Sequence, residues 1–104
     1  SVAVENHAKK FRFGIVREFA GHGIGREMHE NPHIPNWGKK SDGPLLRAGM
    51  TLAIEPMFLL GGEQLRCDDD GWTVRTADRK CAVHWEHTIL VTKNSPEVLT
   101  RLKK

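Results

Sequence analysis

The chain has 104 residues, of which 38% are hydrophobic and 28% are charged, and its formal net charge is +3. This length allows one domain with a modest core, and this composition argues against disorder. The positive surplus is small and dispersed, which favours a solvated surface and no specific nucleic-acid partner. No stretch approaches the ~20 apolar residues of a membrane span. No signal peptide is recognisable, so we expect a cytoplasmic protein without a membrane partner.

The predicted elements are mainly strands. Residues 2–11 have the pattern of the end of a longer helix, because no N-cap precedes them. Residues 21–25 contain three glycines and are not expected to form regular helix, and residues 30–44 are rich in turn formers and are predicted to be turn and loop. Strands are predicted over residues 13–19, 50–60, 61–67, 71–76, 81–92 and 97–102. The sequence therefore predicts an α+β segment, mainly antiparallel sheet with little helix.

Two carboxylates interrupt apolar predicted strands. Pro56 follows Glu55 and has no N–H for a ladder hydrogen bond, which indicates a bulge or a strand edge. A buried carboxylate is costly without a partner, so Glu55 is either paired with an arginine or acts as a metal ligand or acid–base group. Glu86 shares a predicted strand face with His84. These two side chains either face solvent or bind a ligand.

The stretch "GHGIGREMHENPHIPNWG", residues 21–38, contains the histidines that draw most attention. His22 lies between glycines, which allow a backbone or a ligand to come close. The spacing from His22 to His29 is not that of an HExxH motif, so no zincin helix is predicted. His22, Glu55 and Glu86 form a nitrogen and oxygen set that suits Zn, Mn, Co or Fe. This assignment leaves His29 for proton transfer or carbonyl polarisation.

The two cysteines, Cys67 and Cys81, form no CxxC motif. This pattern favours two reduced, partly buried thiols. The alternatives are a single disulfide, or a metal site made by Cys81 with His84 and His87.

Four motifs, taken in order, resemble those of one enzyme family. They are "GHGIGREMHENPHIPNWG", "GMTLAIEPMF", "DGWTVRTADRK" and "WEHTILVT". They are similar to the catalytic half of type I methionine aminopeptidases, which are dinuclear metalloenzymes of the pita-bread fold. The large insert of type II enzymes between the second histidine and the first glutamate is absent. The resemblance implies that residues 1–104 are the C-terminal half of a single metallo-aminopeptidase domain.

The resemblance implies removal of the initiator methionine from proteins and peptides by metal-activated water. It assigns His22 and Glu55 to one metal ion and makes Glu86 a bridge between two divalent ions (Co, Mn, Fe or Zn). It assigns His29 to the scissile carbonyl and gives Glu55 a proton-transfer role as well. Two aspartate ligands and a further histidine would belong to an N-terminal half that precedes Ser1. The chain alone is therefore expected to be inactive, and to be marginally stable or to self-associate.

Met28 and Trp72 match positions that line the pocket for the methionine side chain, and His29 would also bind substrate. The alternative for Met28 and Trp72 is ordinary core packing. The expected partners are the N-terminal methionine of nascent peptides, the missing half of the domain, and the ribosome as a further candidate. Two other functions remain open: a non-catalytic pita-bread module that binds proteins or ribosomes, and a mononuclear metal-binding domain.

Overall fold

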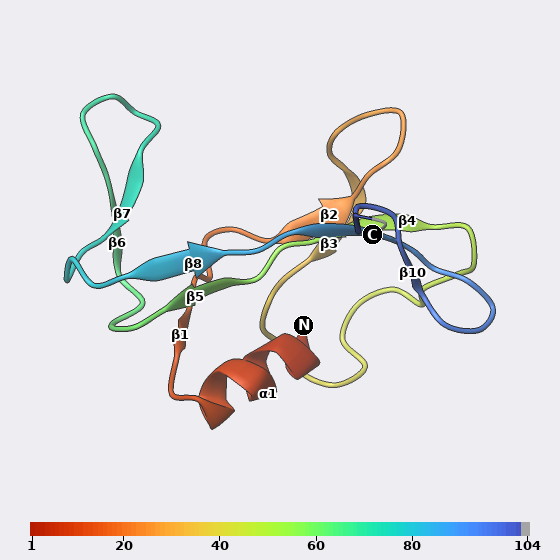
Figure 1. Cartoon of the computed structure of the whole chain (residues 1–104), viewed down its shortest axis with the longest axis horizontal. Helices are drawn as coiled ribbons and strands as arrows, with labels where there is room; N and C mark the ends of the chain where they lie inside the picture. Colours follow the sequence, from red (N-terminus) through yellow and green to blue (C-terminus); the bar gives the residue numbers. More distant parts are fainter. Residues whose placement is uncertain (103–104) are drawn as a thin grey trace.

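A computed structural model describes residues 1–102 (Figure 1). Its helix, α1, covers Val2–Lys10. Short strands follow: β1 (Gly14–Ile15), β2 (Gly21–Gly23), β3 (Glu30–Ile34), β4 (Thr51–Ile54), β5 (Met57–Leu59), β6 (Leu65–Cys67), β7 (Val74–Thr76), β8 (Ala82–His84), β9 (His87–Leu90) and β10 (Glu97–Val98). In the described part of the chain, no helix is long and apolar enough to cross a membrane.

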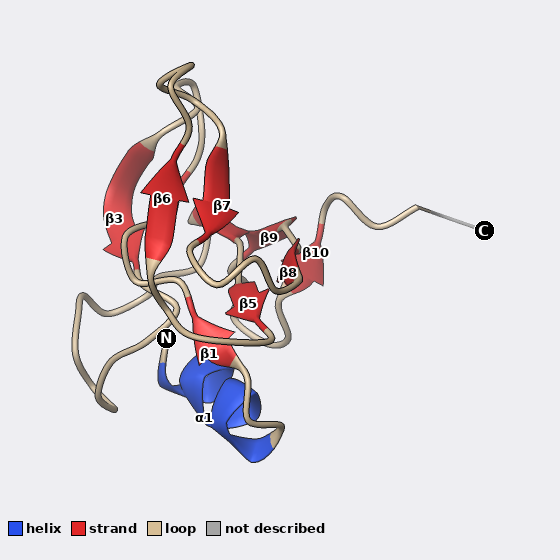
Figure 2. Ribbon diagram, turned by 90° about the vertical axis from the view of Figure 1, so that its left-hand side faces the viewer, coloured by secondary structure: helices blue, strands red, loops and turns tan. Residues whose placement is uncertain are grey.

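The strands form antiparallel sheets, as the sequence predicts. A five-stranded sheet has the order β10-β9-β4-β2-β3, a three-stranded sheet has the order β1-β5-β8, and β6 pairs with β7. The β6–β7 hairpin projects from one end of the molecule, and α1 lies beside β1 (Figures 1 and 2). The prediction of an α+β segment with little helix is confirmed for the described residues.

Each of two predicted strands is divided into two shorter strands, and the two breaks lie where the five-stranded and three-stranded sheets meet. The predicted strand over residues 50–60 breaks at Glu55 and Pro56 into β4 and β5, which belong to different sheets. The predicted strand over residues 81–92 breaks in the same way between β8 and β9. Single long strands are therefore wrong for both segments. The interruption expected from Pro56, which cannot donate a ladder hydrogen bond, is confirmed.

A segment predicted to be loop contains a strand, and the glycine-rich segment that was not expected to be helix forms another. The glycine-rich residues 21–25 include β2, and the turn-rich residues 30–44 include β3. β2 lies between β3 and β4. Main-chain carbonyls of its neighbours come so close to Gly21 and Gly23 that a side chain would not fit at either position. The strand predicted over residues 13–19 is reduced to the two residues of β1. The other predicted strands are shorter than expected at one end.

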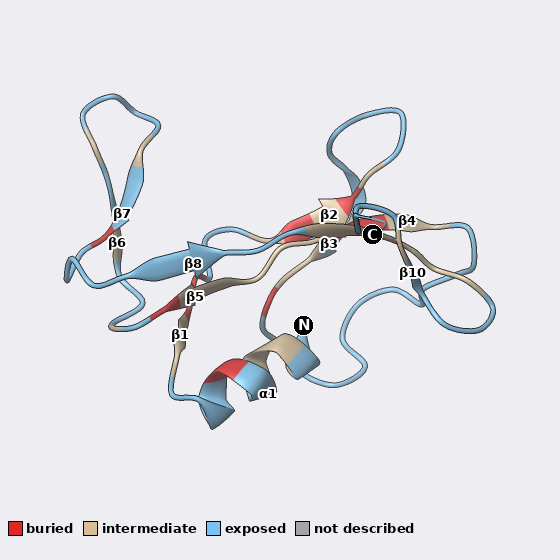
Figure 3. Ribbon diagram, viewed as in Figure 1, coloured by how far each residue is buried: buried red, intermediate tan, exposed pale blue. Residues whose placement is uncertain are grey.

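The buried core is small and lies on both sides of the strand breaks. Leu52 and Ala53 of β4 are fully buried, and so is Leu59 of β5 (Figure 3). Ala8 of α1 and Ile15 of β1, the strand that neighbours β5, are buried as well. The same few apolar residues therefore hold β4 and β5 in place, and with them the segment that contains Glu55.

The replacement Gly23→Ala should destabilise the chain because a Cβ at Gly23 would overlap the main-chain carbonyl of Asn31. Forcing a methyl group into such a contact costs about 1–3 kcal/mol of the free energy of unfolding. Urea denaturation followed by circular dichroism measures this loss. Gly62→Ala is the matched control, because a Cβ at Gly62 meets only ordinary van der Waals contact. Equal stability of the two variants would contradict the close approach at β2.

Candidate metal centre

The strand register places Glu55 opposite Glu86. Ile54 pairs with His87 on one side of the break, and Met57 pairs with His84 on the other. The residues between these pairs keep the same register, and the Trp85 N–H donates to the Pro56 carbonyl at 3.1 Å. Like charges directly opposite each other on a strand pair are destabilising. Two facing carboxylates at this position therefore favour a bound cation.

A compact group of ligand atoms surrounds this carboxylate pair. Glu55, His84 and Glu86 each offer one nitrogen or oxygen, and these atoms lie within 4.8 Å of one another. The Glu55 side chain is 12% exposed, whereas His84 and Glu86 are exposed to solvent. Carboxylates combined with imidazole suit Zn, Mn, Co or Fe. The donor set present in this chain thus fits a divalent metal ion.

His22 contacts Glu55 from the neighbouring strand. Its Nε2 lies 3.2 Å from Glu55 Oε1, and its Nδ1 lies 2.8 Å from the carbonyl oxygen of Gly23. A carbonyl oxygen can only accept, so this contact assigns the proton of a neutral imidazole to Nδ1. The lone pair of Nε2 then faces the carboxylate. Metal-binding histidines have the same arrangement, with the second ring nitrogen donating to a carbonyl.

The main chain at Glu55 is held separately from its side chain. Asn36 is 2% exposed, and its amide nitrogen donates to the Glu55 carbonyl at 3.0 Å. The Glu55 carboxylate is paired with His22 and His84, and no arginine or lysine pairs with it among residues 1–102. The alternative in which Glu55 has an arginine partner is therefore wrong.

His29 lies against His22. The two ring centroids are 4.2 Å apart and the ring planes are tilted by 45°. Both rings line a hollow of about 490 Å³ beside β2 and β3, together with Gly21 and Asn31. His29 itself is exposed. Its ring is therefore available to a molecule that enters this hollow and approaches the ligands of the candidate metal centre.

Met28 and Trp72 are exposed and lie in separate loops. Met28 is 70% exposed in the loop between β2 and β3, and Trp72 is 88% exposed at the tip of the β6–β7 hairpin. Both loops rise on the same side of the molecule in Figure 1, but they lie apart from each other. Core packing is thus wrong for both side chains. The described residues bring them to no common pocket, and their role in substrate binding stays a prediction.

The turn that presents Trp72 is well ordered by one aspartate. Asp70 accepts hydrogen bonds from the main-chain N–H groups of Trp72 and Thr73 at 2.9 and 2.8 Å. It also accepts a hydrogen bond from the Thr73 hydroxyl at 2.5 Å. The Thr73 hydroxyl, followed by these main-chain donors, holds the pKa of Asp70 below its usual value. Asp70 therefore holds the main chain of the turn that carries the exposed Trp72 side chain.

Both cysteines are free thiols, and both are exposed. The expectation of partly buried thiols is therefore wrong, and the disulfide alternative is wrong as well. The alternative metal site at Cys81 has no support in the described part of the chain. The group that could bind an ion contains His84 but neither Cys81 nor His87, and His87 Nδ1 contacts the Thr100 hydroxyl at 2.8 Å.

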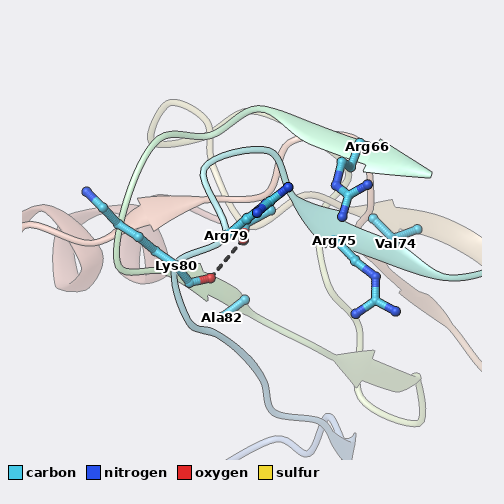
Figure 4. Close-up of a pocket in the computed structure, with 7 residues that line it drawn as sticks. Arg66, Val74, Arg75, Arg79, Lys80 and Ala82 are labelled. Carbon is cyan, nitrogen blue, oxygen red and sulfur yellow. Dashed lines mark hydrogen bonds between the residues drawn. The ribbon is translucent and has the colours of Figure 1, made fainter. Parts of the chain in front are cut away.

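A second hollow lies on the β6–β7 hairpin and has a basic lining. Its volume is about 470 Å³, and Arg66, Arg75, Arg79 and Lys80 contribute to its wall (Figure 4). Asp68 accepts from Arg75 at 2.6 Å and pairs with Arg66 at 3.7 Å. The Lys80 side chain runs away from Arg66 and Arg75 (Figure 4). These cations do not converge on one point, and the hollow contains no residue of the candidate metal centre.

Fold and donor set together define a class. Antiparallel strands that hold a histidine and two facing glutamates are the features expected of a metallopeptidase. The model of metallopeptidase family M24 matches residues 1–93, and the chain belongs to this family.

Within the family, the chain is similar to methionine aminopeptidases. It is 48% identical over 100 residues to the enzyme of Clostridium perfringens, a match that covers 96% of this chain and 40% of the relative. It is 56% identical over 88 residues to methionine aminopeptidase 1 of Mycobacterium tuberculosis, covering 85% of this chain and 33% of the relative. The crystal structure of the Thermotoga maritima methionine aminopeptidase superimposes with a TM-score of 0.92 at 45% identity, over 95% of this chain and 40% of that one.

These matches confirm the resemblance and the partial pita-bread fold that the sequence predicts. They also show that the chain spans about 40% of the length of relatives such as the C. perfringens enzyme. His84 is a member of the compact ligand group, although the set predicted from the sequence was His22, Glu55 and Glu86. The alternation that places His84 on the strand face of Glu86 had indicated that it either faces solvent or binds a ligand.

Proposed function

We propose that the chain is the C-terminal half of a methionyl aminopeptidase domain, which removes the initiator methionine from proteins and peptides. Family membership and the similarity to methionine aminopeptidases support this proposal. The observation that carries it is the position of Glu55 opposite Glu86, with the imidazole of His22 on the Glu55 carboxylate. A domain of this kind is expected to be cytoplasmic and to act on nascent peptides, with the ribosome as a further partner.

In this proposal the chain's own residues hold two divalent ions and move a proton. His22 and Glu55 would be ligands of one ion, and Glu86 would be a ligand of both ions. When bound, two such ions (Co, Mn, Fe or Zn) lower the pKa of water and so supply a nucleophile near neutral pH. Glu55 accepts a proton from the nucleophile at its carboxylate and returns it to the leaving amine.

His29 has a separate task in the same proposal. Its exposed ring lies beside His22, at the edge of a hollow that is open to a peptide. A ring N–H at this place donates a hydrogen bond to the oxygen of the scissile carbonyl as that oxygen becomes negatively charged. Met28 and Trp72 are proposed to contact the methionine side chain of the substrate, each from its own loop.

The experiment compares the 104-residue chain alone with the same chain joined to the part of the C. perfringens enzyme that it does not match. The isolated chain should not hydrolyse Met-Ala-Ser in the presence of Co²⁺ or Mn²⁺, because it supplies only some of the ligands. The joined protein should release methionine, and EDTA should abolish the release. Chromatography of the products measures both results.

The control is the joined protein with Glu63→Gln. This carboxylate pairs with Arg17 at 2.8 Å and is not part of the metal centre, so activity should persist. A joined protein that folds and binds metal ions but releases no methionine would favour the non-catalytic module instead. Methionine release by the isolated chain would contradict the need for a second half.

A further inference from the structure

We propose that His84 is a positioning residue, which orients the Glu55 carboxylate for metal binding. This inference rests on the proposed metal centre. His84 Nε2 lies 3.3 Å from Glu55 Oε2, whereas His22 Nε2 lies 3.2 Å from Glu55 Oε1. The two oxygens of one carboxylate thus face two different imidazoles, and only one of these imidazoles was expected at the centre.

The fold determines where His84 lies. It is the last residue of β8, and its Cα pairs with that of Met57 in β5. Glu55 is two positions before Met57, so it is the diagonal neighbour of His84 on the same face of the strand pair. The ladder bonds of β5 and β8 fix this separation. The contact is therefore a consequence of strand register and does not depend on a flexible loop.

The two histidines differ in what their second ring nitrogen contacts. His22 Nδ1 lies 2.8 Å from the Gly23 carbonyl, the arrangement typical of a metal-ligating histidine. His84 makes no such Nδ1 contact among the described residues, and its side chain is 49% exposed. Its Nε2 is therefore free to carry the ring proton and to donate a hydrogen bond to Glu55 Oε2. This difference assigns His22 to the metal ion and His84 to the carboxylate.

A donor on Oε2 has a direct effect on ion binding. A free carboxylate turns about its terminal bond, and this freedom is lost when an ion binds. Asn36 restrains only the main chain of Glu55, so in the described part of the structure His84 is the residue placed to restrain its Oε2. Outer contacts of this kind typically change metal affinity by about 10–100-fold. His84 thus keeps Oε1 directed to the side where His22 Nε2 lies.

The test combines Co²⁺ titration with nitrogen NMR of the metal-free chain. In the 104-residue chain, His84→Ala should weaken Co²⁺ binding about 10–100-fold. His84→Gln keeps an N–H donor and should restore most of the affinity. Neither change should move the visible absorption band of bound Co²⁺, because the ligand set is unchanged. His7→Gln, which alters a histidine in α1, is the control and should bind as the unmodified chain does.

Long-range ¹H–¹⁵N spectra of the metal-free chain report on the contact itself. They should show His84 protonated at Nε2, and this resonance should shift in Glu55→Gln. A shifted Co²⁺ band in His84→Ala, with no rescue by His84→Gln, would overturn the proposal by making His84 a ligand. Unchanged affinity in His84→Ala, or no response of its ring to Glu55→Gln, would also overturn it. If the unmodified chain binds no Co²⁺, the same variants are titrated in the joined protein, and failure of that protein to bind Co²⁺ would count against the proposed metal centre.

Discussion

Replacing Glu55 with glutamine should lower the Co²⁺ affinity of the chain by at least about 100-fold. This loss exceeds that expected for an outer contact because a proposed ligand of the ion loses its negative charge. Glu55 has an imidazole 3.2 Å from one oxygen and another 3.3 Å from the second, so its carboxylate is common to both contacts. An amide keeps the shape of the side chain but loses the charge that offsets the ion.

Isothermal titration calorimetry measures this effect, and the absorption of bound Co²⁺ gives an independent value. Glu63→Gln is the control, because Glu63 is a glutamate outside the candidate metal centre whose 42% exposed side chain pairs with Arg17. Arg17 holds the pKa of Glu63 below its usual value through their hydrogen bond, so Glu63→Gln should affect folding and leave Co²⁺ affinity unchanged. Equal Co²⁺ affinities in the Glu55 and Glu63 variants would show that the ion binds elsewhere.

The chemistry of the centre could be predicted further from the sequence than its geometry. Glu55 was identifiable because an ionised side chain in an apolar strand needs a compensating partner. Pro56 indicated the strand break because it lacks a ladder donor. The structure adds that the partner strand breaks at the matching register, so that Glu86 lies directly across from Glu55. The register between two segments about 30 residues apart is a property of the folded chain. The residue periodicity within one segment cannot predict it.

Other features were hidden for identifiable physical reasons. β2 consists of Gly-His-Gly, which has no apolar alternation, because neighbouring carbonyls occupy the space of its missing side chains. The contact of His84 with Glu55 depends on a diagonal relation across two strands, which sequence spacing does not give. Met28 and Trp72 match a family pattern, yet their side chains are exposed and apart in the described structure. A shared pocket would therefore have to be completed by atoms outside these 102 residues.

Replacing His29 with alanine should lower kcat of the joined protein by about 10²–10³-fold, the usual loss when one donor to a developing oxyanion is removed. His29 has an exposed ring, and its contact is with the ring of His22 at 4.2 Å between centroids. Co²⁺ affinity should stay unchanged, because the imidazoles that contact the Glu55 carboxylate are those of His22 and His84. Steady-state hydrolysis of Met-Ala-Ser and a Co²⁺ titration of the same samples separate the two effects.

His33→Ala is the control that isolates the hydrogen bond from the general effect of an imidazole. His33 pairs with His22 across β2 and β3 and lines the same hollow as His29, but it is not assigned to the carbonyl. Its removal should therefore leave kcat close to that of the joined protein. If His29→Ala weakens Co²⁺ binding as much as it lowers kcat, then His29 acts by supporting the ring of His22. If His33→Ala lowers kcat as much as His29→Ala does, the histidines that line the hollow act together. In that case no single hydrogen-bond donor to the carbonyl is responsible for the loss.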